Sequence, residues 1–209
     1  MKFSRRTFSL ILCCFIFFRS GAQSIDISIL KPIYKNETKF KNNFSSAEAN
    51  SVTYFNIAAP AGLFIAGLAK HDNKLKVDAA YSAGAILLNT IIVQSTKRIV
   101  NRSRPFVTYP DIIIKSRDGE TGGYSFPSGH TSSAFCTATS ISLYFPKWYV
   151  IAPSYLWASA VGWARMYQGD HYPSDVLVGA IVGSGSAWLS YKIQKRMEKK
   201  KLAANSISF

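Results

Sequence analysis

The chain has 209 residues, enough for one domain with a sizeable core. It is 48% hydrophobic and only 17% of its residues are charged, which excludes intrinsic disorder, because a disordered chain lacks the apolar surface needed to offset its ordering entropy. Lysine and arginine number 25 against 11 acidic residues, and the resulting net charge of +14 indicates anionic partners. Composition alone does not choose among nucleic acid, phosphate esters and acidic lipid head groups, but the sequence has no nucleic-acid reader motif, so nucleic acid is the least favoured of the three.

Residues 1–22 are typical of a secretory signal peptide. A basic start is followed by an apolar run over 10–18, and Ser20 and Ala22 are small residues before a cut at Gln23. The apolar run has about half the length that a membrane-spanning helix needs. Two alternatives stay open: an uncleaved first membrane helix, and a twin-arginine export signal, since two adjacent arginines precede the apolar run.

The rest of the chain divides by composition. Residues 23–51 are polar and are predicted to form an N-terminal surface arm, and the lysine-rich residues 193–209 a basic tail. Between them lies a domain over 52–192 that contains five stretches without a single charged residue or histidine. These stretches are 52–69, 79–96, 131–145, 148–164 and 176–191.

Helix is the expected structure of all five stretches, because each is longer than a usual strand. A surface helix of a soluble bundle carries a charged face opposite its apolar stripe, and none of these five has one. We therefore predict an all-α membrane bundle with about five transmembrane helices. The basic tail fits a cytoplasmic location, which puts the ends of the helices near residues 97, 130 and 170 on the outer side.

Three short motifs fall at those outer helix ends, and together they suit a phosphoryl group. A phosphoryl group in transfer spreads its charge over its equatorial oxygens and needs positioned donors. Lys97, Arg104 and Arg165 supply cations, and the two guanidinium groups have a fork geometry suited to phosphate. Ser128 and Gly129 directly precede a predicted helix, whose first N–H groups point toward an anion.

Two histidines and an aspartate complete the predicted site. His171 precedes the last apolar stretch and is a candidate nucleophile that attacks phosphorus. Asp175, four residues further on, is expected to accept the other ring N–H, which fixes the tautomer and stabilises the imidazolium. His130 is placed to protonate the leaving oxygen and then to activate water. No cysteine or histidine spacing predicts a metal site.

Each residue also has an ordinary structural interpretation. A single Lys or Arg at a helix end is usually an anchor that reaches for the interface, and a single His at a helix start is usually a cap. The ordered combination of all three motifs makes coincidence a poor explanation. Asp170 is interpreted as a solvated loop acid, and Arg102 as a helix-end anchor or a steering charge for head groups. Residues 106–126 form a long loop, which we interpret as a substrate-shaping segment.

The three motifs resemble the signature of the type 2 phosphatidic acid phosphatase and vanadium haloperoxidase superfamily, over roughly residues 52–192. The resemblance implies an all-helical fold and metal-independent hydrolysis of a phosphate monoester or diphosphate, with no cofactor. It also implies a phosphohistidine on His171, acid–base work by His130, support by Asp175, and phosphate binding by Lys97, Arg104, Ser128, Gly129 and Arg165. The chain departs from the family at Ala164, where the family usually has serine.

The preferred function is a lipid phosphatase of a bacterial-type inner membrane, with its site at the membrane–water rim facing the periplasm or outside. Candidate substrates are polyprenyl diphosphate, lipid A and glycerophospholipid phosphates. Three alternatives are a secreted soluble acid phosphatase, a vanadate-dependent haloperoxidase, and a non-enzymatic lipid-binding protein. The uncharged helices oppose the first, the short chain opposes the second, and the full set of catalytic residue types opposes the third.

Overall fold

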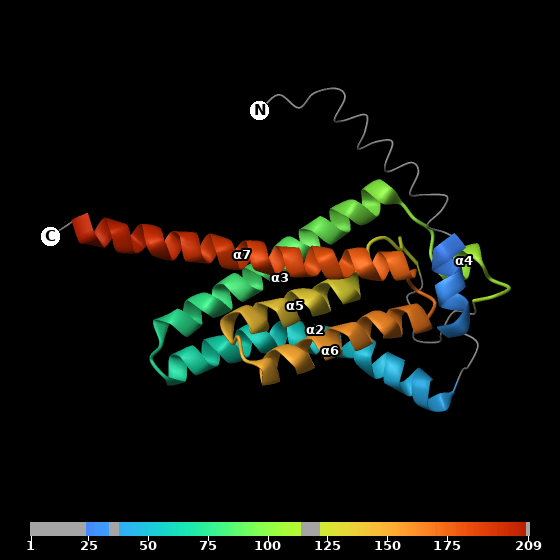
Figure 1. Ribbon diagram of the computed structural model, residues 1–209, viewed down its shortest axis with the longest axis horizontal. Helices are drawn as coiled ribbons and strands as arrows, with labels where there is room; N and C mark the ends of the chain where they lie inside the picture. Colours follow the sequence, from blue (N-terminus) through green and yellow to red (C-terminus); the bar gives the residue numbers. More distant parts are fainter. Residues whose placement is uncertain (1–23, 34–37, 114–121, 208–209) are drawn as a thin grey trace, which may run out of the picture.

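The computed structural model describes residues 24–33, 38–113 and 122–207, and the described parts form an all-α bundle (Figure 1). The prediction of an all-α fold is therefore confirmed, and each of the five apolar stretches forms part of a helix. The predicted signal peptide over 1–22 lies outside the described residues. After a short helix over 24–33 come α2 (Lys39–Ala69), α3 (Asn73–Val100), α4 (Pro105–Thr108), α5 (Gly129–Tyr144), α6 (Trp148–Tyr167) and α7 (Pro173–Ile207).

Helix α3 begins and ends at residues with suitable capping chemistry. The Asp72 carboxylate accepts a hydrogen bond from the backbone N–H of Lys74 at 2.8 Å and so caps the start of α3. The same helix ends at Asn101, which adopts a left-handed backbone conformation with φ of 52°. Because the charged flanks continue the helical structure, α2, α3 and α7 reach 31, 28 and 35 residues and extend well beyond the uncharged stretches.

Helix α5 lies at the centre of the bundle and packs against α2, α3, α6 and α7. Its closest approach is to α7, at two glycines. A Cβ on Gly183 would lie 2.0 Å from the Ser132 carbonyl oxygen, and one on Gly179 would lie 2.7 Å from that of Ser128. Only glycine permits this contact, which brings the first turn of α7 beside the first turn of α5.

The distribution of polar and apolar side chains is typical of a protein in lipid. Leu87, Leu177 and Ile181 are each 63% exposed on the outside of the bundle. Hydroxyl groups lie inside instead: Thr139 of α5 hydrogen-bonds Tyr155 of α6 and Ser184 of α7. In water this pattern would be unfavourable, whereas in a bilayer it satisfies the polar groups internally.

Three helical segments are long and apolar enough to cross a membrane: α2, the segment Asn73–Thr108 that contains α3, and Pro173–Ala204 of α7. Five such segments were expected. Helix α5, with 16 residues, is short for a span, and nine of its residues are buried against its neighbours. Helix α6 has 20 residues and is long enough for a span, but its mean hydropathy is too low. The length and composition of the described helices thus support three spans.

The segment predicted as a polar surface arm is largely helical. Leu30 of the helix over 24–33 is fully buried and packs with Ile113 and Tyr172. Helix α2 begins at Lys39, well before the uncharged stretch that starts at residue 52. The helix over 24–33 therefore lies against the loops that follow α4 and α6, at the same end of the bundle as the predicted site (Figure 1).

Candidate active site

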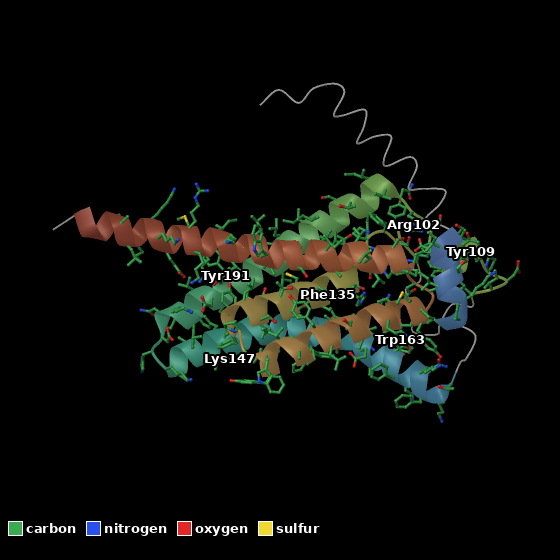
Figure 2. All side chains as sticks on the ribbon, in the orientation of Figure 1. Arg102, Tyr109, Phe135, Lys147, Trp163 and Tyr191 are labelled. Carbon is green, nitrogen blue, oxygen red and sulfur yellow. The ribbon has the colours of Figure 1, made fainter. Side chains whose placement is uncertain are left out.

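One end of the bundle collects the residues that the three motifs contribute. The C-terminal end of α3, the short α4, the start of α5, the end of α6 and the start of α7 all lie there (Figure 1). Figure 2 places Arg102 and Tyr109 at this end, and Lys147 and Tyr191 toward the other. Segments that are far apart in sequence thus meet at a single location.

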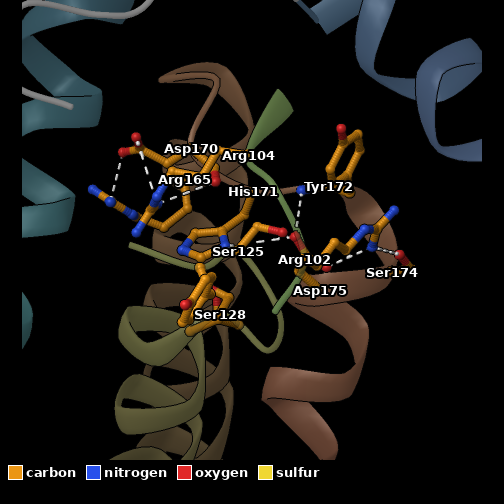
Figure 3. A network of polar contacts seen from close by, with 12 residues as sticks. Arg102, Arg104, Ser125, Ser128, Arg165, Asp170, His171, Tyr172, Ser174 and Asp175 are labelled. Atoms are coloured by element: carbon orange, nitrogen blue, oxygen red, sulfur yellow. Dashed lines mark hydrogen bonds and ion pairs between the residues drawn. The ribbon is translucent and has the colours of Figure 1, made fainter. Parts of the chain in front are cut away.

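Two arginines from different motifs converge on Asp170. The Arg165 guanidinium lies 2.6 Å from the Asp170 carboxylate (Figure 3). The Arg104 guanidinium lies 3.8 Å from the same carboxylate and donates to the backbone carbonyl oxygen of Asp170 at 3.2 Å. All three side chains are almost completely buried. Gln168 also accepts a hydrogen bond from Arg165 at 2.6 Å. Asp170 and Gln168 therefore fix the directions in which the two guanidinium groups point.

His171 lies between this arginine cluster and Asp175 (Figure 3). Its Nδ1 is 3.6 Å from Asp175 Oδ2, and both side chains are fully buried. The same Oδ2 accepts a hydrogen bond from the Tyr172 backbone N–H at 2.9 Å. Asp175 is thus oriented toward the imidazole, although at 3.6 Å the contact is longer than a hydrogen bond.

The opposite oxygen of Asp175 is held by Arg102. Arg102 Nη1 donates to Asp175 Oδ1 at 2.6 Å, and Nη2 donates to Asp26 Oδ2 at 2.7 Å. The guanidinium also lies 3.9 Å from the centre of the Tyr172 ring. Burial raises the pKa of the Tyr172 phenol, so this ring stays neutral beneath the cation.

The start of α5 provides backbone groups beside these side chains. Ser128 occupies the N-cap position, but its hydroxyl pairs with the Thr131 hydroxyl at 2.8 Å and makes no capping hydrogen bond to the first turn. Its own N–H donates to the Asp175 carbonyl oxygen at 3.1 Å, which ties the starts of α5 and α7 together. A Cβ placed on Gly129 would lie 3.9 Å from Lys97 Cε, so the second and first motifs are in close proximity.

A cavity of about 490 Å³ opens at this end between α2, α3 and α5. Four of the eight predicted site residues line it: Lys97, Arg104, Gly129 and His130. The other four, Ser128, Arg165, His171 and Asp175, are buried and do not line the cavity. Arg104 connects the two groups, because it lines the cavity and also contacts Asp170. Lys97 additionally donates to the Tyr124 carbonyl oxygen, and Arg104 to that of Gly122, so the last part of the loop over 106–126 borders the site.

The interpretation of Asp170 as a solvated acid was wrong, because its side chain is fully buried between two arginines. Arg102, interpreted as an anchor or steering charge, instead holds Asp175 and Asp26. Asp26 was missed altogether, since it lies 149 positions before Asp175 in a segment without a motif. A buried guanidinium needs a carboxylate partner. The position of Asp170 directly beside His171 was the one feature of the sequence that indicated a role for this acid in the site. Ala164, where the family usually has serine, is fully buried. The neighbouring Arg165 donates a hydrogen bond to the Gln168 side chain.

Comparisons with known proteins bear on the family and the fold of the chain. The model of the PAP2 superfamily matches residues 78–199, which confirms the resemblance inferred from the motifs. Undecaprenyl-diphosphatase of Sulfolobus acidocaldarius is 26% identical over 199 residues, which cover 92% of this chain and 91% of that protein. Lipid A 4'-phosphatase of Bacteroides thetaiotaomicron is 36% identical over 85 residues, 41% of this chain but 37% of that protein's length.

The fold has a solved counterpart. The first transmembrane PAP2-type phosphatidylglycerolphosphate phosphatase from Bacillus subtilis superposes with a TM-score of 0.70, covering 91% of this chain and 94% of that one at 22% identity. At this identity the likeness concerns the fold alone. The helices described above are thus arranged as in that transmembrane phosphatase.

Proposed function

The chain belongs to the PAP2 superfamily of membrane lipid phosphatases, and we propose that it hydrolyses a lipid phosphate ester through a covalent intermediate on His171. The observation that carries the proposal is the charge balance around that imidazole. Four cations, Lys97, Arg102, Arg104 and Arg165, gather around three carboxylates at one end of the bundle. The surplus positive charge, next to an open cavity, favours a dianionic ligand.

The chemistry follows from the two histidines. His171 presents Nδ1 to Asp175, which leaves Nε2 as the atom that attacks phosphorus. As the N–P bond forms, the bond from phosphorus to the lipid oxygen breaks, and His130 gives that oxygen its proton. Neutral His130 then takes a proton from water, the water oxygen attacks phosphorus, and the N–P bond breaks. Inorganic phosphate leaves and both histidines return to their starting states.

The remaining cations and the start of α5 hold the transferred group. Lys97 and Arg104 line the cavity and are the donors closest to an entering phosphate. Arg165, oriented by Asp170 and Gln168, supplies a third donor. The backbone of Gly129 and its neighbours at the α5 N-terminus completes the cradle, because helix N-termini favour anions. Such positioned donors stabilise the charge that spreads over the phosphoryl oxygens in the transition state.

The membrane placement is part of the proposal. After removal of residues 1–22, the helices α2, α3, α5, α6 and α7 cross the bilayer, with the short α5 enclosed by the others, and put the site at its outer rim, where lipid phosphates lie. The support is geometric: the site end of the bundle is opposite the loop between α2 and α3, and α7 carries its basic residues away from the site (Figure 1). Lysines at that other end fit the positive-inside tendency.

The cavity wall favours one class of lipid. Asn89 precedes Lys97 by eight residues on α3, so the cavity extends about 12 Å from the phosphate level into the bundle. Over that depth its wall carries amide and hydroxyl side chains: Thr53, Asn56, Asn89, Thr90, Gln94 and Ser133. These groups match the esters, amides and hydroxyls of lipid A or a glycerophospholipid. Asn56, Asn89, Thr90 and Ser133 already hydrogen-bond within the bundle. A polyprenyl chain would cover the Thr53 and Gln94 side chains without offering them a hydrogen bond, which is costly. We therefore rank acylated lipids above polyprenyl diphosphate as substrates.

The test is phosphate release by the purified full chain in detergent, without added metal and with a chelator. The panel is lipid A, phosphatidylglycerol phosphate and undecaprenyl diphosphate, and we expect turnover with the first two to exceed that with the third. His171→Ala should abolish turnover, a loss of at least about 10³-fold. His71→Asn, in the turn at the other end of the bundle, is the matched control and should keep full activity.

The covalent intermediate has its own measurement. In His130→Ala the first step loses its acid and the second its base. Phosphate label that the protein does take up from the lipid should therefore remain on it in an acid-labile form, because the second step cannot proceed at its normal rate. A wild-type chain that releases no phosphate from any of the three lipids would overturn the proposed function. Normal turnover by folded His171→Ala would overturn the proposed nucleophile alone.

A further inference from the structure

Arg102 is positioned between two buried carboxylates that come from opposite ends of the chain. One guanidinium nitrogen donates to Asp175 at 2.6 Å and the other to Asp26 at 2.7 Å. Asp26 is 3% exposed and Asp175 is fully buried. Charged groups in such a place are stable only when they are paired and hydrogen-bonded, so the three side chains act as one unit.

Asp26 has a second attachment, to the first turn of α7. Its Oδ1 accepts from the Ser174 backbone N–H at 2.9 Å, and its Oδ2 accepts from the Ser174 hydroxyl at 2.6 Å. Helix α7 starts at Pro173, so Asp26 caps this helix from a distant part of the sequence. Ser174 also accepts a hydrogen bond from Arg102 at 2.8 Å, which closes the cluster.

The consequence reaches the imidazole through Asp175. Arg102 holds Oδ1 of this carboxylate, which leaves Oδ2 to face His171 at 3.6 Å. If the guanidinium turned, the Asp175 carboxylate would lose one of the contacts that fix its plane. Only Asp26, Ser174, Asp175 and the Tyr172 ring are seen to direct the Arg102 guanidinium, among the described residues.

We propose that Asp26 is a positioning residue of the active site: by orienting Arg102 and capping α7, it sets the direction of Asp175 and hence of His171. Asp26 does not touch the phosphate. The helix over 24–33 is thereby a working part of the catalytic unit, anchored by the buried Leu30. This inference rests on the proposed function, because its effect is seen only in a chain that turns over phosphate.

The sharpest variant is Asp26→Asn. Asparagine keeps the shape and can still accept from the Ser174 N–H, so the cap persists while the charge that orients Arg102 is lost. We expect kcat to fall by about 10- to 10²-fold with KM nearly unchanged, because a misdirected nucleophile slows the chemical step without removing a phosphate donor. Asp26→Glu restores the carboxylate and should recover a large part of kcat.

The matched control is Asp72→Asn, which changes a capping carboxylate at the start of α3, at the other end of the bundle. It should leave kcat and KM at wild-type values. Thermal unfolding of each variant in detergent then separates a change in the site from a loss of fold. A drop in kcat of Asp26→Asn at a temperature where the variant is fully folded supports the proposal.

A double-mutant cycle with Arg102→Gln tests the route. If Asp26 acts through Arg102, Asp26→Asn should change kcat by less than about twofold in the Arg102→Gln background. Unchanged kcat in folded Asp26→Asn, a loss confined to KM, or losses that multiply independently in the double variant would each overturn the proposal. Wild-type turnover on the lipid panel, measured first, distinguishes these outcomes from failure of the proposed function.

Discussion

Each end of the bundle has a buried aspartate, but the two aspartates lie in different surroundings. At the site end, the buried Asp175 links the start of α7 to Arg102 after α3. At the other end, the buried Asp78 of α3 accepts from Gln194 of α7 at 2.5 Å and pairs with Lys74 at 2.9 Å. Both carboxylates join α3 to α7. A buried aspartate at a helix junction is thus no indication of catalysis by itself.

The difference lies in what surrounds each carboxylate. The cavity at the site end is lined by Lys97, Arg104 and His130 together with amide and hydroxyl groups. The cavity at the other end, about 350 Å³, is lined almost entirely by apolar side chains, with Lys70 as its one charged residue. A phosphate needs several converging donors and an imidazole within reach, and only the first cavity combines them.

Substitution of one lysine at each end by alanine should give the largest difference in kcat. Lys97→Ala removes a proposed phosphate donor and should lower kcat by about 10²–10³-fold. Lys70→Ala removes the only charge from the apolar cavity and should leave kcat unchanged. The measurement is steady-state phosphate release by both variants in the same detergent. Equal losses in the two variants would mean that the lysines act through general charge or membrane binding and not as a specific donor.

Asp170 offers a smaller effect at the site end. Asp170→Asn keeps the shape but removes the charge that pairs with Arg165 at 2.6 Å, so both arginines lose part of their orientation. We expect kcat to fall by about 10- to 10²-fold, because small displacements of positioned donors are costly. Kinetics and thermal unfolding should be measured together. A variant with wild-type kcat and a lowered melting temperature would reduce Asp170 to a structural role.

Much of the site could be predicted because its residues stand in short motifs. Lys97 and Arg104 lie seven positions apart, and His171 and Asp175 lie four apart at a helix start, so local spacing already indicates shared location. The helical class followed from stretches that lack charge. These signals are local, and they survive in the sequence without knowledge of the fold.

The parts that sequence could not supply depend on tertiary contacts. Asp26 reaches Arg102 across 76 positions of the chain, and no periodicity connects them. The burial of Asp170 depends on Arg104, which arrives from a different helix. The number of spans also depends on packing: length and composition of the described helices support three, whereas the charge-free α5 is short for a span and its hydroxyl groups face its neighbours. Absence of charge therefore indicates a helix that is shielded from water. Whether lipid or other helices shield it is decided by tertiary packing.

The smallest expected effect on activity is at Asp78, where the comparison between the two ends is most direct. Asp78→Ala removes the acceptor for Gln194 and Lys74 and should lower the free energy of unfolding by about 1–3 kcal/mol. The exposed Lys74 simply returns to solvent, so the loss falls short of that for a fully buried ion pair. Activity per folded molecule should stay at the wild-type value, because Tyr144 still donates to Gln194 and keeps α5 against α7. Thermal unfolding in detergent, with phosphate release measured well below the transition, checks both parts. If kcat fell in proportion to the lost stability, the two ends would be coupled through α3 and α7, and the division between a structural carboxylate and a catalytic one would fail.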